Sequence, residues 1–110
     1  MEGGIKSQGK FSSSYKKLEL LGKGGFSEVY SCRSKKDPSV VNAVKIISKQ
    51  DMTEDDLYYI LNEIDILSKI DHPNIVRFFE LFDDEDSLYL VFENMKGGDV
   101  RLSNNLFIFI

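Results

Sequence analysis

The feature that most constrains this fold is a glycine-rich run, Gly22-Lys23-Gly24-Gly25, between two segments with the pattern of β-strands. Residues 15–21 alternate apolar and charged side chains, and residues 27–33 contain the β-formers Val29 and Tyr30. A dinucleotide-binding fold would need a helix directly after the glycines, and a P-loop would need a Lys followed by Ser or Thr. A strand pattern follows instead, so the run predicts a glycine-rich hairpin.

The stretch after residue 52 predicts a helix. Thr53 is a good N-cap, and Asp56, three residues later, completes a capping-box pattern with Asp in place of Glu or Gln. Acidic residues crowd the first turn, where the positive end of the helix dipole favours them. Apolar residues then form one stripe at spacings of three and four: Leu57, Ile60, Ile64 and Leu67. The pair His72-Pro73 is expected to end the helix.

Three further segments predict strands. Residues 40–47 are rich in β-branched side chains, and residues 75–82 and 88–92 are short apolar runs. The acidic run between the last two, residues 83–87, is interpreted as a solvated hairpin turn, with a metal site as the weaker alternative. The coarse order is therefore β-β-β-α-β-β.

The charge of the chain argues against two classes of partner. Its 14 basic and 18 acidic residues are well mixed and give a net charge of -4, which predicts neither nucleic acid nor a membrane surface. No apolar run approaches the length of a membrane span. Cys32 is the single cysteine, so we expect a buried thiol in a reducing compartment. The first residues show no apolar signal segment, so the cytoplasm is the expected location, with the nucleus left open.

The two ends of the chain differ from its middle. Residues 1–14 are mostly Gly, Ser, Lys and Gln with few apolar anchors, which predicts a disordered lead. Residues 100–110 form an apolar tail, too short for a membrane anchor and expected to favour association. Val100-Arg101 can be encoded by the bases that commonly begin an intron. The tail is therefore interpreted as translated intron or a mispredicted exon end, with a true short protein and a truncated pseudogene as the alternatives. The underlying nucleotide sequence decides among them.

Five motifs follow one another in the order found in protein kinases. They are the segment 21–29 that contains the glycine-rich run, Ala43-Val44-Lys45, the helix segment 62–67 with Glu63, the segment 72–76 that begins His-Pro-Asn, and the strand 88–93. Residues 15–99 therefore resemble the nucleotide-holding half of a protein kinase of the calcium/calmodulin-dependent serine/threonine type. The resemblance implies an α+β fold, a five-stranded antiparallel sheet with one packed helix, which is the small lobe of a kinase.

The resemblance also implies a nucleotide site. Lys45 would reach the α- and β-phosphates of ATP, and Glu63 would be its supporting ion partner. A lysine that faces inward on an apolar strand needs such a partner, because an unpaired buried ammonium is costly. The alternatives are a solvent-facing lysine on an edge strand and a surface glutamate. The nucleotide-binding residues implied are Leu21, Gly22, Lys23, Gly24, Gly25, Phe26, Ser27, Glu28, Val29, Ala43, Lys45, Glu93 and Met95.

Particular contacts follow from the resemblance at the adenine. Val29 and Ala43 would lie over the adenine ring, positions that are equally compatible with ordinary sheet packing. The Glu93 carbonyl and the Met95 amide would bond to the adenine edge. Phe92, directly before them, occupies the gatekeeper position and would close the back of the pocket.

Two other positions bear on the resemblance. Leu67 and Phe78 match the upper members of the hydrophobic spine that joins the two kinase lobes, so their ends are expected to be open in this chain. Ser27 stands where the family pattern has its third glycine, which leaves the loop slightly less free to close.

The motifs that perform phosphotransfer, His-Arg-Asp and Asp-Phe-Gly, do not occur in this sequence. Taken alone, the chain is therefore expected to be inactive and to bind ATP weakly, with the protein ligands of Mg²⁺ missing. Another protein that covers the open lobe face is an expected partner. The alternative function is a non-catalytic binding module that competes for a kinase's partners.

Overall fold

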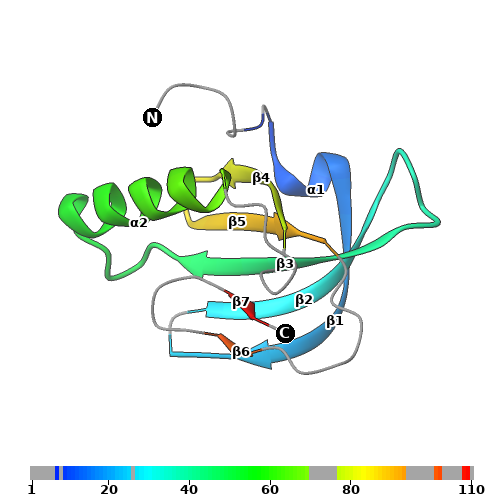
Figure 1. Cartoon of the computed structure of the whole chain (residues 1–110), viewed down its shortest axis with the longest axis horizontal. Helices are drawn as coiled ribbons and strands as arrows, with labels where there is room; N and C mark the ends of the chain where they lie inside the picture. The colour runs from blue at the N-terminus through cyan, green and yellow to red at the C-terminus, as the bar shows by residue number, and fades with distance from the viewer. Residues whose placement is uncertain are drawn as a thin grey trace.

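The computed structural model describes Ser7, residues 9–25, 27–69 and 77–93, and two short strands further on. The elements are α1 (Phe11–Ser14), β1 (Tyr15–Lys23), β2 (Ser27–Ser34), β3 (Val41–Ser48), α2 (Glu54–Leu67), β4 (Phe78–Asp83), β5 (Ser87–Phe92), β6 (Arg101–Leu102) and β7 (Ile108–Phe109). One antiparallel sheet has the order β1-β2-β3-β5-β4, and β6 pairs with β7. Figure 1 shows α2 running alongside β4 and β5. The predicted five-stranded antiparallel sheet with one packed helix is confirmed.

The start of α2 follows its predicted cap. The Thr53 hydroxyl accepts a hydrogen bond from the Asp56 backbone N–H, and the Asp56 carboxylate accepts one from the Thr53 N–H, both at 3.1 Å. This reciprocal arrangement satisfies two of the donors that every helix leaves open at its first turn. The capping box therefore fixes where the helix begins.

The inner face of the sheet, defined as the face that packs against α2, holds the main apolar core. The buried members of this core are Ile47, Ile64, Phe78, Leu81, Leu88, Leu90 and Phe92, and the α2 residues Leu57, Ile60 and Leu61 pack against them. Ile64 is fully buried, which contributes about 1.5–3 kcal/mol for a side chain of this size. The described members of the predicted stripe, Leu57, Ile60 and Ile64, thus belong to the surface by which α2 packs on the sheet.

The outer face, on the opposite side of the sheet, holds a second cluster. Its buried members are Phe11, Tyr15, Cys32, Val44, Phe82 and Val91. Alternate side chains of a strand point to opposite faces, so Val44 lies on the outer face while its neighbours Ala43 and Lys45 lie on the inner one. The expected buried thiol, Cys32, belongs to this cluster.

The N-terminal segment differs from the predicted disordered lead. Ser7 and residues 9–14, named here the N-terminal strap, are described, and Phe11–Ser14 form a single helical turn. Phe11 is 5% exposed because its ring packs into the outer cluster. A single aromatic anchor in a polar segment is thus sufficient to bring this part of the chain onto the sheet.

Element boundaries also differ from those predicted. The glycines do not end β1, because Gly22 pairs with Val29 and Lys23 pairs with Glu28. Helix α2 ends at Leu67, before the predicted His72-Pro73 stop, which lies outside the described residues. Strand β4 begins at Phe78 rather than at residue 75.

Candidate functional site

Lys45 occupies the middle of the inner face. Its register partners are Val29 in β2 and Leu90 in β5, and both are fully buried. Lys45 itself is 3% exposed, an unusual position for an ammonium group. The alternative interpretation, a solvent-facing lysine on an edge strand, is therefore wrong, since β3 is flanked by strands on both sides.

Burial changes the acidity of this amine. It lowers the pKa of Lys45 from 10.5 to about 8, because the charged form loses hydration, and the Glu63 carboxylate opposes that shift. Glu63 lies on α2, one residue before the buried Ile64, and is itself only half-buried. The helix that packs on the inner face thus also carries the charge that acts on Lys45.

Lys45 and Glu63 do not form a direct ion pair in this conformation. Direct ion pairs between described residues include Lys49–Asp83 and Lys69–Asp65, but none joins Lys45 to Glu63. The two groups therefore interact electrostatically at longer range, so the supporting ion pair expected from the sequence remains a prediction.

The glycine-rich run forms the predicted hairpin between β1 and β2. The Gly24 N–H donates to the Ser27 carbonyl at 2.8 Å, and this bond closes the turn beyond the Lys23–Glu28 pair. A Cβ added at Gly24 would lie 3.3 Å from the Ser27 hydroxyl, closer than most side-chain contacts. Gly24 thus permits the close approach of Ser27, although its own amide is used by the turn. Phe26 lies outside the described residues.

The residues expected around the adenine are only partly described. Ala43 pairs with Phe92 across β3 and β5, and the two are 1% and 0% exposed. The Glu93 N–H donates to the Arg77 carbonyl and its carboxylate accepts from the Arg77 N–H, both at 2.9 Å. The carbonyl that would bind adenine is a different atom of Glu93. Met95 lies outside the described residues.

The spine position Phe78 differs from expectation. Its end was predicted to be open, but Phe78 is 6% exposed because its ring packs edge-on against Phe92, with centroids 5.6 Å apart. The chain therefore buries this residue by itself. The side chain of Leu67, the other expected spine member, lies outside the described residues.

A hollow of about 310 Å³ lies beside the glycine-rich hairpin. Its lining includes five residues expected at the nucleotide, namely Lys23, Gly24, Gly25, Ser27 and Glu28, but neither Lys45 nor Ala43. Glu28 and Ile46 are register partners one residue away from the Val29–Lys45 pair, so their side chains lie on the opposite face of the sheet from Lys45. Its mixed charges favour no particular ligand.

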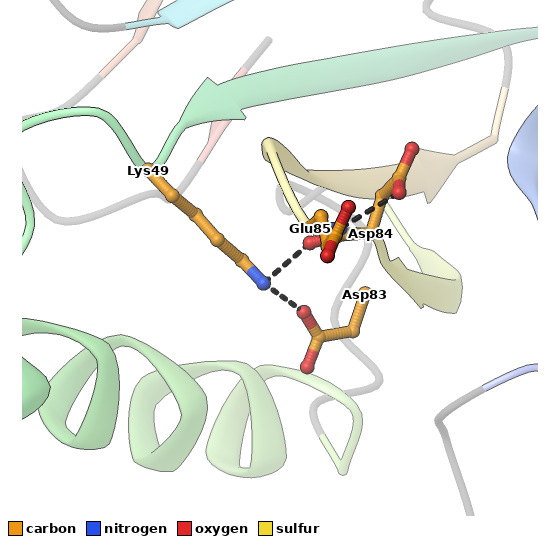
Figure 2. A network of polar contacts seen from close by, with 4 residues as sticks. All are labelled: Lys49, Asp83, Asp84 and Glu85. Carbon is orange, nitrogen blue, oxygen red and sulfur yellow. Dashed lines mark hydrogen bonds and ion pairs between the residues drawn. The ribbon is translucent and has the colours of Figure 1, made fainter.

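Sequence reasoning missed Lys49 and its contacts with the acidic turn. Figure 2 shows the Lys49 ammonium group donating to the Asp83 carboxylate and to the Asp84 carbonyl. The Lys49 N–H also donates to the Asp86 carbonyl at 3.0 Å. This cluster ties the loop before α2 to the β4–β5 turn. The sequence contains both groups, a lysine four residues after Lys45 and the acidic run at residues 83–87. They are far apart in the chain, so only the fold shows that they are in contact.

The acidic run itself forms the predicted hairpin turn. The Asp84 N–H donates to the Ser87 carbonyl at 3.0 Å and so closes the connection between β4 and β5. The described residues contain no group of three or more His, Cys, Asp or Glu side chains that could hold a metal ion. The hairpin-turn interpretation is confirmed.

Comparison with known proteins agrees with this geometry. A family model described as the protein kinase domain matches residues 15–107, which extends past residue 99, where the resemblance was expected to end. The chain is 43% identical over 84 residues to calcium/calmodulin-dependent protein kinase type 1 of Macrobrachium nipponense, covering 74% of this chain and 24% of that protein. It is 41% identical over 86 residues to myosin light chain kinase A of Dictyostelium discoideum, covering 78% and 29%.

The chain belongs to the protein kinase family, and the described sheet and helix correspond to the N-terminal lobe of that domain. It spans only about a quarter of the length of the two curated relatives just named. A further relative, serine/threonine-protein kinase ULK3 of Mus musculus, is 38% identical over 82 residues, covering 74% of this chain and 17% of that protein. Among the described residues, no helix has the length and apolar character needed to cross a bilayer.

Proposed function

We propose that this chain is the ATP-binding lobe of a serine/threonine protein kinase, in which Lys45 contacts the nucleotide phosphates and Glu63 supports it. The observation that carries the proposal is the burial of Lys45 on the inner face, beside the apolar side chains of Val29 and Leu90. A strand interior tolerates such a lysine only where its charge has a use or a partner. The three relatives named above are protein kinases, two of them with serine/threonine or calmodulin-dependent kinase in their names.

The residues present fit a nucleotide at two places. The ammonium group of Lys45 suits phosphate oxygens, because an anion would replace the hydration that burial removes. Val29 and Ala43 are apolar and lie on the same face of the sheet as Lys45, which suits a flat base, and both are buried in this conformation. The remaining positions assigned to the nucleotide are Leu21, Gly22, Lys23, Gly24, Gly25, Phe26, Ser27, Glu28, Glu93 and Met95.

The chemistry assigned to this lobe is positioning. ATP supplies the γ-phosphoryl group that a kinase transfers to a hydroxyl. In this chain Lys45 would fix the α- and β-phosphates, Glu63 would hold the Lys45 ammonium in place, and the inner face would exclude water from the base. Mg²⁺ belongs to the same chemistry in the family, but the described residues offer no cluster of metal-ligating side chains, so we assign no metal ligand to them. The cytoplasm is the proposed location, in keeping with a buried free thiol at Cys32.

Nucleotide titration of the chain tests this proposal. We expect saturable but weak ATP binding, with a dissociation constant of roughly 1 mM, about -4 kcal/mol, because one wall of a cleft leaves much of the ligand exposed. Lys45→Met should weaken binding at least several-fold by calorimetry. Lys16→Met removes the same charge from an exposed position in β1 and serves as the matched control. Equal affinity of the chain and the Lys45→Met variant would contradict the proposed phosphate contact.

A further inference from the structure

The N-terminal strap covers the part of the outer face formed by Tyr15, Phe82 and Tyr89. The Phe11 ring stacks on Tyr15 and on Tyr89, with centroids 5.2 and 5.0 Å away and interplanar angles of 7° and 8°. Phe82 meets the same ring edge-on at 5.9 Å. Phe11 is the single large apolar side chain in the described part of the strap. One ring therefore supplies most of the apolar contact by which the strap is held.

A carboxylate on β4 accepts hydrogen bonds from the N-terminal end of the strap and from the first residue of β1. The Ser7 hydroxyl donates to one carboxylate oxygen of Glu80, and the Tyr15 hydroxyl donates to the other. The Ser7 N–H also donates to the Leu81 carbonyl at 2.7 Å. Strand β4 lies at the edge of the sheet, so this bond covers an otherwise open strand edge. Both oxygens of Glu80 act as acceptors, and a negative group in place of either hydroxyl would face a carboxylate.

We propose that Ser7 is a phosphorylation site whose modification releases the N-terminal strap from the outer face. The reaction uses a nucleoside triphosphate and a separate protein kinase. A bond forms between the Ser7 Oγ and the γ-phosphorus, the bond from that phosphorus to its bridging oxygen breaks, and the nucleoside diphosphate leaves. The hydroxyl proton passes to the base of the modifying kinase. The proposal does not depend on nucleotide binding by this chain.

Electrostatics gives the direction of the effect. A phosphoserine carries a charge of about -1.5 to -2 at pH 7 and no longer donates a hydrogen bond to a carboxylate. Glu80 would lose one of its two hydroxyl donors and gain a like charge beside it. Ser7 is half-buried and thus partly exposed to solvent, whereas Tyr15 is 8% exposed. Ser7 is therefore the accessible member of this pair of hydroxyl groups.

The other end of the strap stays tethered. The Lys35 N–H donates to the Ser14 carbonyl at 2.9 Å, and the Lys35 ammonium group donates to the Ser12 carbonyl at 2.6 Å. Release at Ser7 would thus peel the strap from its N-terminal side as far as Phe11, without separating Tyr15 from the sheet.

Cys32 provides a reporter of that release. It is fully buried in the same cluster as Phe11 and Tyr15, and it is the only cysteine of the chain. Burial, together with a smaller contribution from the Glu80 carboxylate, raises the pKa of the Cys32 thiol to about 12. Disulfide reagents react with the thiolate, so we expect the buried Cys32 to react slowly while the strap is in place.

The test compares three forms of the 110-residue chain: unmodified, with phosphoserine at position 7, and with phosphoserine at position 12. Ser12 is the matched control because it is an exposed strap residue whose hydroxyl makes no hydrogen bond among the described contacts. The readout is the rate at which an aromatic disulfide reagent modifies Cys32. We expect phosphoserine at position 7 to raise this rate at least about tenfold, as for the loss of one charge-assisted hydrogen bond.

Two further measurements make the outcome decisive. Phe11→Ala gives the rate for a chain without the aromatic anchor, which the form phosphorylated at position 7 should approach. Far-ultraviolet circular dichroism checks that the sheet persists in every form. Equal Cys32 rates for phosphorylation at positions 7 and 12 would overturn the proposal. Loss of the strand signal on phosphorylation at position 7 would also overturn it, because the strap would then be an integral part of the core.

Discussion

Glu63 on α2 is the charged group that opposes the effect of burial on Lys45 in β3. The two are brought near each other because the apolar stripe of α2 packs on the inner face that Lys45 shares. Burial is the larger effect, so the pKa of Lys45 remains about 8 instead of its ordinary 10.5. The site thus contains a buried amine whose charge costs stability in the absence of a bound anion.

Lys45→Met should stabilise the chain at pH 7. The folded-state pKa is the lower one, so the unfolded chain binds more protons between about pH 8 and 10.5, and the contribution of Lys45 to stability rises with pH through that window. Below pH 8 the amine is charged in both states, so the folded chain is destabilised by the full free energy of burying the charged Lys45 ammonium group. Replacing the ammonium by an apolar group should raise the free energy of unfolding by about 1–3 kcal/mol at pH 7.

Urea denaturation of Lys45→Met at pH 7 and pH 10 measures this gain. Most of the stabilisation should vanish at pH 10, because the amine of the unmodified chain is then mainly neutral when folded. Lys16→Met, at an exposed position, should show no comparable dependence. A Lys45→Met gain that stays the same at both pH values would show that packing, and not charge, is its cause.

Glu63→Gln should lower the pKa of Lys45 further. The carboxylate favours the charged amine, so its removal leaves burial unopposed. The NMR chemical shift of the Lys45 ε-methylene, followed with pH, reports this titration. Asp55→Asn removes the same charge from an exposed position on the same helix and should leave the Lys45 titration unchanged. Equal shifts in the two variants would mean that net charge, rather than the position of Glu63, sets the pKa.

Local patterns were sufficient to predict the five strands of the sheet and α2, but not α1, β6 or β7. The capping residues Thr53 and Asp56 and the stripe that contains Ile64 predicted α2, because a helix start and an amphipathic face are properties of neighbouring residues. The burial of Lys45 was also readable, since it lies in a strand of apolar neighbours. These features depend on residues close together in the chain.

Long-range contacts could not be predicted in this way. Phe11 is one aromatic residue in a polar segment, and its burial depends on Tyr89 and Phe82, which are brought to it by the sheet. The contact of Lys49 with Asp83 likewise depends on the return of β4 to the edge beside β5. Nothing in the periodicity of the sequence encodes such pairs. Composition therefore predicted disorder for the strap, and it predicted the hairpin turn at residues 83–87 without its contact to Lys49.

Thr53→Ala should destabilise the chain through the start of α2. The substitution removes the acceptor of the Asp56 N–H and so breaks one half of the capping box. The expected loss is about 1 kcal/mol in the free energy of unfolding, measured by urea denaturation. Thr53→Asn keeps a capping oxygen and should lose much less. If Thr53→Ala and Thr53→Asn were equally destabilising, the cap would not be the reason for the effect.

Lys49→Met tests whether the contact between the loop before α2 and the acidic turn stabilises the fold. The Lys49 and Asp83 side chains are 20% and 17% exposed, and the ammonium group has a second acceptor in the Asp84 carbonyl. A partly buried, charge-assisted contact of this kind should contribute more than an ion pair in open solvent. We expect Lys49→Met to lower the free energy of unfolding by about 1–2 kcal/mol.

Lys69→Met is the matched control for that experiment, because Lys69 also pairs with an aspartate, Asp65. Their side chains are 74% and 42% exposed, so solvent screens this pair and its loss should cost at most about 0.5 kcal/mol. Urea denaturation at low and high salt distinguishes the two ion pairs. The loss of stability in Lys69→Met should become smaller at high salt, whereas the loss in Lys49→Met should remain. Hydrogen exchange at the Asp84 amide, which bonds to the Ser87 carbonyl, should accelerate only in Lys49→Met. Equal losses and equal exchange in both variants would show that the Lys49 contact is an ordinary surface ion pair.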